Sequence, residues 1–323
     1  MKKVVARANS NIALVKYWGK KDEKLIIPQN SSVSMTLDAL YTITEVEFTD
    51  ERDMYFLDGE LQDDKEHAKI SEYIDIFRKK SKIFKYVKVN SINYVPTSAG
   101  LASSASGYAA LAMALNKLFG LNYNMENVSK MARLGSGSAS RSIFGGFVEW
   151  KRGVDHDTSF SHKICDNDWD ISMIVIIINA KKKEISSRDG MKRTVETSPY
   201  YNAWIDSAER DVISIKEAIN DRDFQKMGEI AELSAMKMHA TMMSANPPII
   251  YFKSDSIKAI ELVKKIRNAG IPCYYTMDAG PNVKVICESK NADIIADEFR
   301  KYIKNDIIIS KIGTDAKILE EIK

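Results

Sequence analysis

Cysteine is scarce in this sequence, and so is histidine. The chain of 323 residues contains 3 cysteines and 4 histidines. Cys165, Cys273 and Cys287 are widely spaced and odd in number, which excludes a disulfide framework and paired metal ligands. The histidines show no metal-ligand spacing among themselves or with the cysteines. We therefore expect reduced thiols and a cytoplasmic protein.

Strong charge of one sign and long hydrophobic runs are also lacking. A net charge of +3, with no basic tail or aromatic-interleaved arginine stripe, predicts no nucleic-acid partner. The most apolar run, residues 171–179, is too short to span a bilayer and predicts a buried strand. Polar residues between Arg7 and Lys16 interrupt any apolar core near the start, so we expect neither a signal peptide nor membrane attachment.

The overall composition is that of an ordinary globular protein. Apolar residues make up 45% and charged residues 28% of the chain. Its length suits one large domain or two ordinary ones. Composition shifts at Lys181–Lys183, beyond which the pattern is mostly helical. We therefore expect two tightly packed domains, 1–180 and 181–323, with a cleft between them.

Residue periodicity predicts the individual elements. The expected strands cover residues 4–8, 12–16, 32–37, 41–48, 54–57, 86–95, 147–152, 171–179, 274–277, 282–287 and 307–309. The expected helices cover residues 65–81, 104–119, 124–134, 198–220, 223–243, 255–269 and 291–302.

The segment 96–105, Pro-Thr-Ser-Ala-Gly-Leu-Ala-Ser-Ser-Ala, is the most informative part of the sequence. It places small residues between a predicted strand and an alanine-rich predicted helix. The free N–H groups of a helix's first turn can bind phosphate where no bulky side chain blocks the approach. Gly100 and Ala102 keep that approach clear, while Ser103 and Ser104 add hydroxyls for phosphate oxygens or a phosphate-bound metal. A serine-capped helix after an ordinary loop is the alternative.

A second segment combines cations with aromatic side chains at the end of a predicted strand. Lys16 and Lys20 flank Tyr17, Trp18 and Gly19. Their ammonium groups and the tyrosine phenol could donate to an anion. The alternative is a strand end whose lysine side chains extend along apolar surface towards water.

A third segment, residues 135–142, alternates glycine and serine before an arginine. So many small residues permit a nest of backbone N–H groups facing an anion. Arg141 could grip a carboxylate or phosphate through two hydrogen bonds. The alternative is a flexible glycine-serine loop.

Asp278 lies in a predicted turn between two strands. A carboxylate in that position can form a turn through its own backbone, or it can serve as a general base or anchor beside a metal. Residues 186–193 form a weaker candidate segment, in which Arg188 and two serines could reach a cleft. Together these segments suit nucleotide phosphates and an acidic substrate, because phosphoryl transfer mainly needs positioning and charge stabilisation.

These motifs resemble those of a known superfamily. Segment 96–105 is similar to the ATP-phosphate loop of the GHMP small-molecule kinases. Residues 11–20 (Asn-Ile-Ala-Leu-Val-Lys-Tyr-Trp-Gly-Lys), 135–142 and 277–282 (Met-Asp-Ala-Gly-Pro-Asn) more closely resemble the diphosphomevalonate decarboxylase family. The resemblance runs nearly end to end.

The resemblance implies an α+β fold with two domains. The N-terminal domain would be of the ribosomal-protein-S5-like kind, and the C-terminal domain a helical layer on an antiparallel sheet. It also implies that ATP, with Mg²⁺, phosphorylates the tertiary 3-hydroxyl of mevalonate 5-diphosphate. Loss of that phosphate and of carbon dioxide would give isopentenyl diphosphate in the mevalonate pathway of isoprenoid biosynthesis. Family members are usually homodimers.

The family's roles carry over to matching positions. Asp278 would be the catalytic carboxylate, Lys16 would keep it ionised, and Arg141 would grip the substrate carboxylate. The residues implied for the substrate diphosphate are Tyr17, Lys20 and Arg188, with Ser138, Ser140, Ser187 and Met191. The residues implied for ATP are Ser91, Asn93, Gly100, Ala102, Ser103 and Ser104, and Ser104 would also reach the metal.

Two positions depart from the family pattern. Ser98 stands where many members have alanine, which adds a hydroxyl and predicts no change of function. Arg188 stands where some members have a neutral residue, which affects the expected contacts to the diphosphate.

Three other functions fit parts of the pattern. They are a mevalonate 3-kinase, a decarboxylase of the monophosphate, and a non-catalytic binder of nucleotides or isoprenoid phosphates. Asp278, Lys16 and Arg141 together favour decarboxylation. Tyr17, Lys20 and Arg188 favour the diphosphate, and a non-catalytic binder would leave Asp278 without a role.

Overall fold

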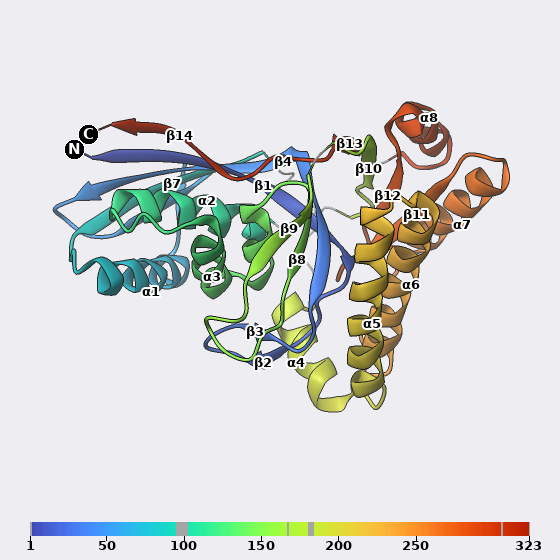
Figure 1. Ribbon diagram of the computed structural model, residues 1–323, viewed down its shortest axis with the longest axis horizontal. Coiled ribbons are helices and arrows are strands. Elements are labelled where there is room, and N and C mark those ends of the chain that lie inside the picture. Colours follow the sequence, from blue (N-terminus) through green and yellow to red (C-terminus); the bar gives the residue numbers. More distant parts are fainter. Residues whose placement is uncertain (1, 95–102, 167, 180–183, 305, 323) are drawn as a thin grey trace.

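The computed structural model describes residues 2–94, 103–166, 168–179, 184–304 and 306–322. It has a mixed α/β architecture in two domains (Figure 1). The strands are β1 (Lys3–Val15), β2 (Lys20–Asp22), β3 (Ile27–Pro28), β4 (Ser32–Thr49), β5 (Met54–Leu57), β6 (Glu60–Leu61), β7 (Tyr86–Tyr94), β8 (Phe147–Trp150), β9 (Ser161–Cys165), β10 (Ile171–Ile176), β11 (Cys273–Met277), β12 (Val283–Glu288), β13 (Ile307–Lys311) and β14 (Lys317–Ile322). The helices are α1 (Asp64–Ser81), α2 (Ser103–Leu118), α3 (Met125–Gly135), α4 (Ser187–Thr197), α5 (Tyr201–Asn220), α6 (Phe224–Met243), α7 (Ser254–Asn268) and α8 (Ala292–Tyr302), with 3₁₀ turns η1 (Gly137–Ile143) and η2 (Ser289–Asn291).

The larger sheet is built around two long strands. Its order is β14-β1-β4-β7-β5-β6, and β8 and β9 extend from β4. We predicted two short strands each for β1 and β4, but both are continuous. The polar residues within β1 have partners, because Asn9 donates to the Thr314 carbonyl (3.1 Å) and Asn11 to the Ser138 carbonyl (3.0 Å). A register shift between Asn9 and Asn11 accommodates them without ending the strand.

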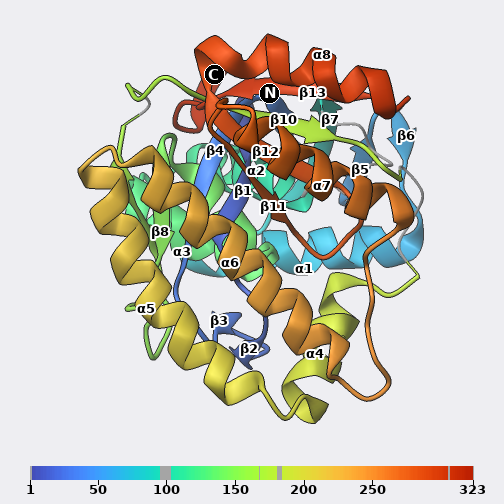
Figure 2. The ribbon, with the colours of Figure 1, turned by 90° about the vertical axis from the view of Figure 1, so that its right-hand side faces the viewer.

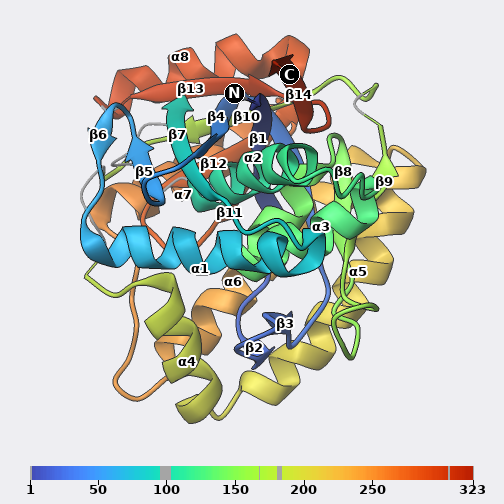
Figure 3. The same cartoon turned by 90° about the vertical axis from the view of Figure 1, so that its left-hand side faces the viewer.

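Helices α1, α2 and α3 cover one face of this sheet (Figure 3). Valines on β1, β4 and β7 pack against the small side chains of α2, including Ala109, Ala110 and Ala112, which are fully buried. Alanine allows α2 to lie close to the strands. That packing fixes the N-terminal end of α2, where the predicted phosphate site lies.

The smaller sheet, β11-β12-β10-β13, is antiparallel throughout. Alternate residues of β10 belong to different cores, since Met173 packs with α5 and α6 while Ile174 packs with α7 and α8. Figure 2 shows α5 and α6 as neighbouring long helices. The core beneath them also includes Leu14 of β1 and Met35 of β4. It therefore joins the two sheets and holds the end of β1 against the C-terminal half.

The two sheets do not divide at residue 180, where we expected the domain boundary. Strand β10 precedes that point but pairs with β12 and β13. Strand β14 comes from the C-terminal end yet pairs with β1, with Lys3 opposite Ile322. The chain ends therefore lie side by side (Figure 1).

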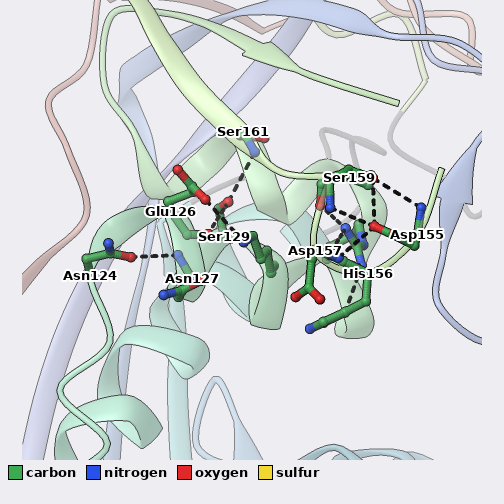
Figure 4. Close-up of polar contacts among 12 residues, drawn as sticks. Asn124, Glu126, Asn127, Ser129, Asp155, His156, Asp157, Ser159 and Ser161 are labelled. Atoms are coloured by element: carbon green, nitrogen blue, oxygen red, sulfur yellow. Dashed lines mark hydrogen bonds and ion pairs between the residues drawn. The ribbon is translucent and has the colours of Figure 1, made fainter. Parts of the chain in front are cut away.

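Polar caps and turns fix the region around α3 (Figure 4). The Asn124 side chain accepts from the Asn127 N–H (3.0 Å) and so begins the helix where the sequence predicted. Ser129 accepts from the Ser161 N–H (3.1 Å), which ties the start of β9 to this helix. We had not predicted β9, β14 or α4. Helix α4 begins at Ser187, and the hydroxyl of the capping residue Ser186 accepts from the Asp189 N–H.

Candidate active site

A cavity of about 510 Å³ lies where the end of β1, the start of α2, the 3₁₀ turn η1, α4, α6 and the turn after β11 meet. Its volume is in the range of small-molecule sites. The lining residues include most of the side chains that the motifs singled out: Lys16, Tyr17, Lys20, Ser103, Ser104, Ser138, Arg141, Ser187, Arg188, Met191 and Asp278.

Asp278 immediately follows β11 and is held by two lysines. Its Oδ1 accepts from Lys16 Nζ (2.7 Å), and its Oδ2 accepts from Lys284 Nζ (2.9 Å). The aspartate side chain is 35% exposed, whereas the two lysine side chains are 1% and 3% exposed. Although burial opposes ionisation, the two ammonium groups hold the pKa of Asp278 well below its usual range. The site therefore presents a carboxylate to the cavity.

Lys16 directly follows β1 and is fixed through several atoms. Its ammonium also donates to the Ala13 carbonyl (2.6 Å), and its backbone N–H donates to Ser234 Oγ (3.1 Å). Burial lowers the pKa of Lys16 to about 8, although Asp278 opposes this shift. The lysine therefore begins to lose its charge just above neutral pH.

Arg141 lies on η1 and is almost fully buried. Its Nε donates to Asn11 Oδ1 (3.1 Å), and another guanidinium nitrogen donates to Ser32 Oγ (2.7 Å). Burial lowers its pKa to about 10, with Asp278 acting in the opposite direction. Both hydrogen-bond partners are neutral, and the guanidinium carbon also lies 5.8 Å from the centroid of the Trp150 ring, so the cavity wall holds a cation without a directly bonded counter-ion among the described residues.

Two cationic side chains and one phenol line another part of the cavity. Lys20 pairs with Glu23 (2.5 Å), and Arg188 is supplied by the first turn of α4. The Tyr17 hydroxyl is buried and has no hydrogen-bond partner in the described part of the chain. Burial raises the pKa of Tyr17, so the phenol keeps its proton as a donor. Ser187 and Met191 complete this side.

The serines of the glycine-serine segment separate into two environments. Ser138 lines the cavity, and its hydroxyl is 3.4 Å from that of Ser136. Ser140 is fully buried outside the lining, where its hydroxyl donates to the Gly137 carbonyl (2.8 Å) and accepts from Ser161 (2.9 Å). The structure therefore does not bring the Ser140 side chain into the cavity lining with Ser138.

The expected nucleotide residues are only partly brought together. Ser103 and Ser104, at the start of α2, line the cavity. Ser91 and Asn93 lie on β7 outside the lining, where they hydrogen-bond to Thr44 and Thr42. These two hydrogen bonds connect β7 to the neighbouring strand β4. The other expected positions, Gly100 and Ala102, lie outside the described residues.

Comparison with known proteins decides the family. The model for the diphosphomevalonate decarboxylase-like N-terminal domain matches residues 8–161, and that for the mevalonate 5-diphosphate decarboxylase C-terminal domain matches residues 173–321. The chain belongs to the diphosphomevalonate decarboxylase family.

Individual relatives agree with this assignment. The chain is 35% identical over 308 residues to diphosphomevalonate decarboxylase from Homo sapiens, which covers 87% of this chain and 76% of the relative. It is 46% identical, with a TM-score of 0.96, to the mevalonate diphosphate decarboxylase structure from Staphylococcus aureus, covering 99% and 98% of the two chains. A structure of MDDEF in complex with MVAPP, AMPPCP and magnesium is also 46% identical, with a TM-score of 0.94 and 99% coverage of both chains. These likenesses confirm the expected two-domain GHMP kinase fold.

The structure of this family member reveals site residues that the motifs missed. Lys284 contacts Asp278, and its signal was a lysine within the otherwise apolar run of β12. His239 on α6 is buried beside Asp278, and burial lowers its pKa to about 3. Glu66, Lys69 and Tyr108 line the cavity from α1 and α2. Their positions depend on how helices cross the sheet, and no local pattern marks them.

The described residues contain neither a cluster of metal ligands nor a membrane-spanning helix. Within those ranges, no group of three or more histidine, cysteine, aspartate or glutamate side chains could hold a metal. In the same ranges, none of the helices is both long and apolar enough to cross a membrane.

Proposed function

We propose that the protein catalyses the ATP-dependent decarboxylation of mevalonate 5-diphosphate to isopentenyl diphosphate, with release of ADP, phosphate and carbon dioxide. The observation that carries this proposal is the placement of Lys16, Arg141 and Asp278 in one cavity with the start of α2. A phosphate site next to a clamped carboxylate and a buried arginine supports phosphorylation followed by loss of a carboxylate.

The chemistry assigns different tasks to these three side chains. A tertiary hydroxyl is a poor leaving group, whereas a phosphate is a good one. Asp278 lies next to the 3-hydroxyl and orients it and accepts its proton as phosphate is transferred. Arg141 binds the substrate carboxylate, whose electrons form the alkene as carbon dioxide leaves. Lys16 keeps Asp278 ionised, because their charges attract at 2.7 Å.

The start of α2 suits the phosphate chain of ATP. First-turn N–H groups and the positive end of the helix dipole favour anions. Ser103 and Ser104 contribute hydroxyl oxygens, a donor type that Mg²⁺ accepts alongside substrate phosphates. Ser104 and the nucleotide phosphates would hold the ion. Bound Mg²⁺ would neutralise charge on the transferring phosphate. The relative solved with AMPPCP and magnesium supports ATP and Mg²⁺ as the ligands.

The cationic and phenolic side chains of the cavity suit the diphosphate of the substrate. Tyr17, Lys20 and Arg188 line the cavity near Met191. The protonated Tyr17 hydroxyl, which has no hydrogen-bond partner among the residues that the structure describes, supports a hydrogen bond to a phosphate oxygen. The relative solved with MVAPP supports mevalonate diphosphate as the substrate.

The cellular setting and assembly are part of the same proposal. The three cysteines are free, which fits a reducing cytoplasm. We propose a homodimer from the resemblance to the family, and light scattering of the purified protein would measure its mass directly.

The decisive experiment compares mevalonate with its 5-monophosphate and 5-diphosphate in the presence of Mg-ATP. We expect carbon dioxide and inorganic phosphate in equal amounts, fastest from the diphosphate. Accumulation of a stable 3-phosphorylated product without gas would instead show the kinase. Preference for the monophosphate would show the sister decarboxylase.

Asp278→Ala tests the carboxylate's role. We expect kcat to fall by about 10²–10⁴-fold, the usual contribution of a general base, while the affinity for ATP is retained. Turnover within about tenfold of the wild type would exclude Asp278 as the base. Equilibrium binding of a fluorescent ATP analogue serves as the control for an intact site.

A further inference from the structure

Lys284 is a buried cation behind the proposed catalytic carboxylate. It lies in the middle of β12, its side chain is 3% exposed, and its Nζ is 2.9 Å from Asp278 Oδ2. Unlike Lys16 and Asp278, it is not one of the residues that line the cavity. It can therefore influence the substrate through its two charged neighbours at the cavity, Asp278 directly and Lys16 by charge.

The register of the smaller sheet explains this contact. Lys284 pairs with Thr276 on β11, and Asp278 lies two residues further along on the same face, at diagonal distance. Val283 and Val285 point to the opposite core, formed with α7 and α8. On the Lys284 face the next residue, Ile286, packs into the core with α5 and α6. An apolar side chain would suit this position, and a lysine there is costly unless paired.

We propose that Lys284 is a positioning residue, which with Lys16 clamps the two oxygens of Asp278 and fixes the orientation of this carboxylate towards the substrate hydroxyl. Each oxygen has its own ammonium donor, from β12 on one side and from the end of β1 on the other. Rotation of the carboxylate would break both bonds. The inference rests on the proposed role of Asp278.

The clamp also sets the charge balance of the site. The charged groups that act on Asp278 and Lys16 are each other, Lys284 and Arg141, and the neutral His239 faces them from α6. Lys284 opposes the charge of Lys16, whose pKa is about 8. Removing Lys284 takes away this like charge and leaves Asp278 to Lys16 alone. Both changes raise the pKa of Lys16, so activity that needs its ammonium should persist to higher pH.

The test compares Lys284→Met, Lys284→Gln and Lys284→Arg in the full-length enzyme. For Lys284→Met we expect kcat to fall by about 10²-fold, since a misplaced catalytic group has effects of that size. The KM for mevalonate 5-diphosphate should stay within about threefold, because Lys284 does not line the cavity. The alkaline limb of the kcat profile should move up by about one pH unit.

A matched control separates these effects from general destabilisation. Lys237 also forms a largely buried ion pair, with Asp211 (2.7 Å), but it joins α5 to α6 outside the cavity lining. Lys237→Met should lower thermal stability without moving the alkaline limb. Lys284→Arg keeps the charge and should restore kcat to within about tenfold of the wild type. If both neutral variants fail to fold, an alkaline limb of Lys284→Arg that coincides with the wild type supports the clamp, and an upward shift overturns it.

Coupling to Asp278 completes the test. In an Asp278→Asn background, Lys284→Met should change the residual kcat by less than about twofold, because the clamped carboxylate is already gone. A full loss in that background overturns the proposal, as does a Lys284→Met enzyme with wild-type kcat and pH profile. These results differ from a failure of the proposed function, in which the wild-type protein itself releases no carbon dioxide.

Discussion

Arg133 on α3 and Arg141 on η1 are both buried, and burial lowers the pKa of each to about 10. Their surroundings differ. Arg133 donates to the carbonyls of Leu25 (3.0 Å) and Ser159, and it contacts the His156 ring (2.9 Å). It thereby joins α3 to the loop before β9 and to the β2–β3 hairpin. Arg141 is held by Asn11 and Ser32 and lines the cavity.

The difference shows that burial of a cation does not by itself identify a binding residue. Arg133 connects three chain segments through backbone acceptors that would otherwise lose a partner. Arg141 donates to the Asn11 side-chain amide and the Ser32 hydroxyl, and it also lines the cavity, where it could bind a carboxylate. One arginine should therefore be needed for folding and the other for turnover, and substitutions can test that division.

Arg141→Gln should produce the largest effect. We expect kcat/KM for mevalonate 5-diphosphate to fall by about 10²–10³-fold, as for loss of one preorganised donor to developing charge. The unfolding free energy should change by less than about 1 kcal/mol, because removing a buried charge offsets the lost hydrogen bonds. Steady-state kinetics and urea denaturation measure the two quantities. An unchanged rate would mean that another residue holds the carboxylate.

Arg133→Gln should show the reverse pattern. Loss of its contacts leaves buried carbonyls unsatisfied, and we expect the free energy of unfolding to fall by about 3 kcal/mol. Turnover per folded molecule should stay within about threefold of the wild type. Denaturation combined with active-site titration separates these quantities. Full stability together with lost activity would contradict the comparison.

Much of the fold could be predicted from local sequence patterns. The helices from α5 to α8 and the buried strand β10 follow from periodicity, although β10 ends earlier than predicted. The pairing of β14 with β1 could not be predicted, because exposed residues at the end of the chain, such as Leu319, give only a weak strand pattern. Strand β1 was split in the prediction because hydrogen-bond partners for Asn9 and Asn11 lie far away in sequence.

The candidate site also depends on contacts between residues that are far apart in the sequence. Lys16, Arg141 and Asp278 could be selected from motifs, and the structure brings them to one cavity. Lys284 stands out in the sequence only as a lysine among apolar residues, and its contact with Asp278 depends on the register between β11 and β12. Burial and pKa shifts also depend on neighbours that only the folded chain supplies.

The smallest effects test the comparison within one motif. Ser138 lines the cavity, whereas the Ser140 hydroxyl is satisfied by Gly137 and Ser161 in the core. Ser140→Ala should reduce the unfolding free energy by about 1–2 kcal/mol through these lost bonds, with little change in KM. Ser138→Ala should leave stability within about 0.5 kcal/mol.

For Ser138→Ala we expect KM for mevalonate 5-diphosphate to rise by about tenfold, which corresponds to one lost hydrogen bond to a charged oxygen. Kinetics and denaturation give a KM and an unfolding free energy for each variant. As with the two arginines, we expect the change at the cavity residue to alter the kinetics and the change at the core residue to alter the stability. If Ser140→Ala raises KM as much as Ser138→Ala does, the Ser140 hydroxyl must leave Gly137 and Ser161 when substrate binds. Because that exchange would give up two buried hydrogen bonds for one new contact, we expect Ser140 to act on stability alone.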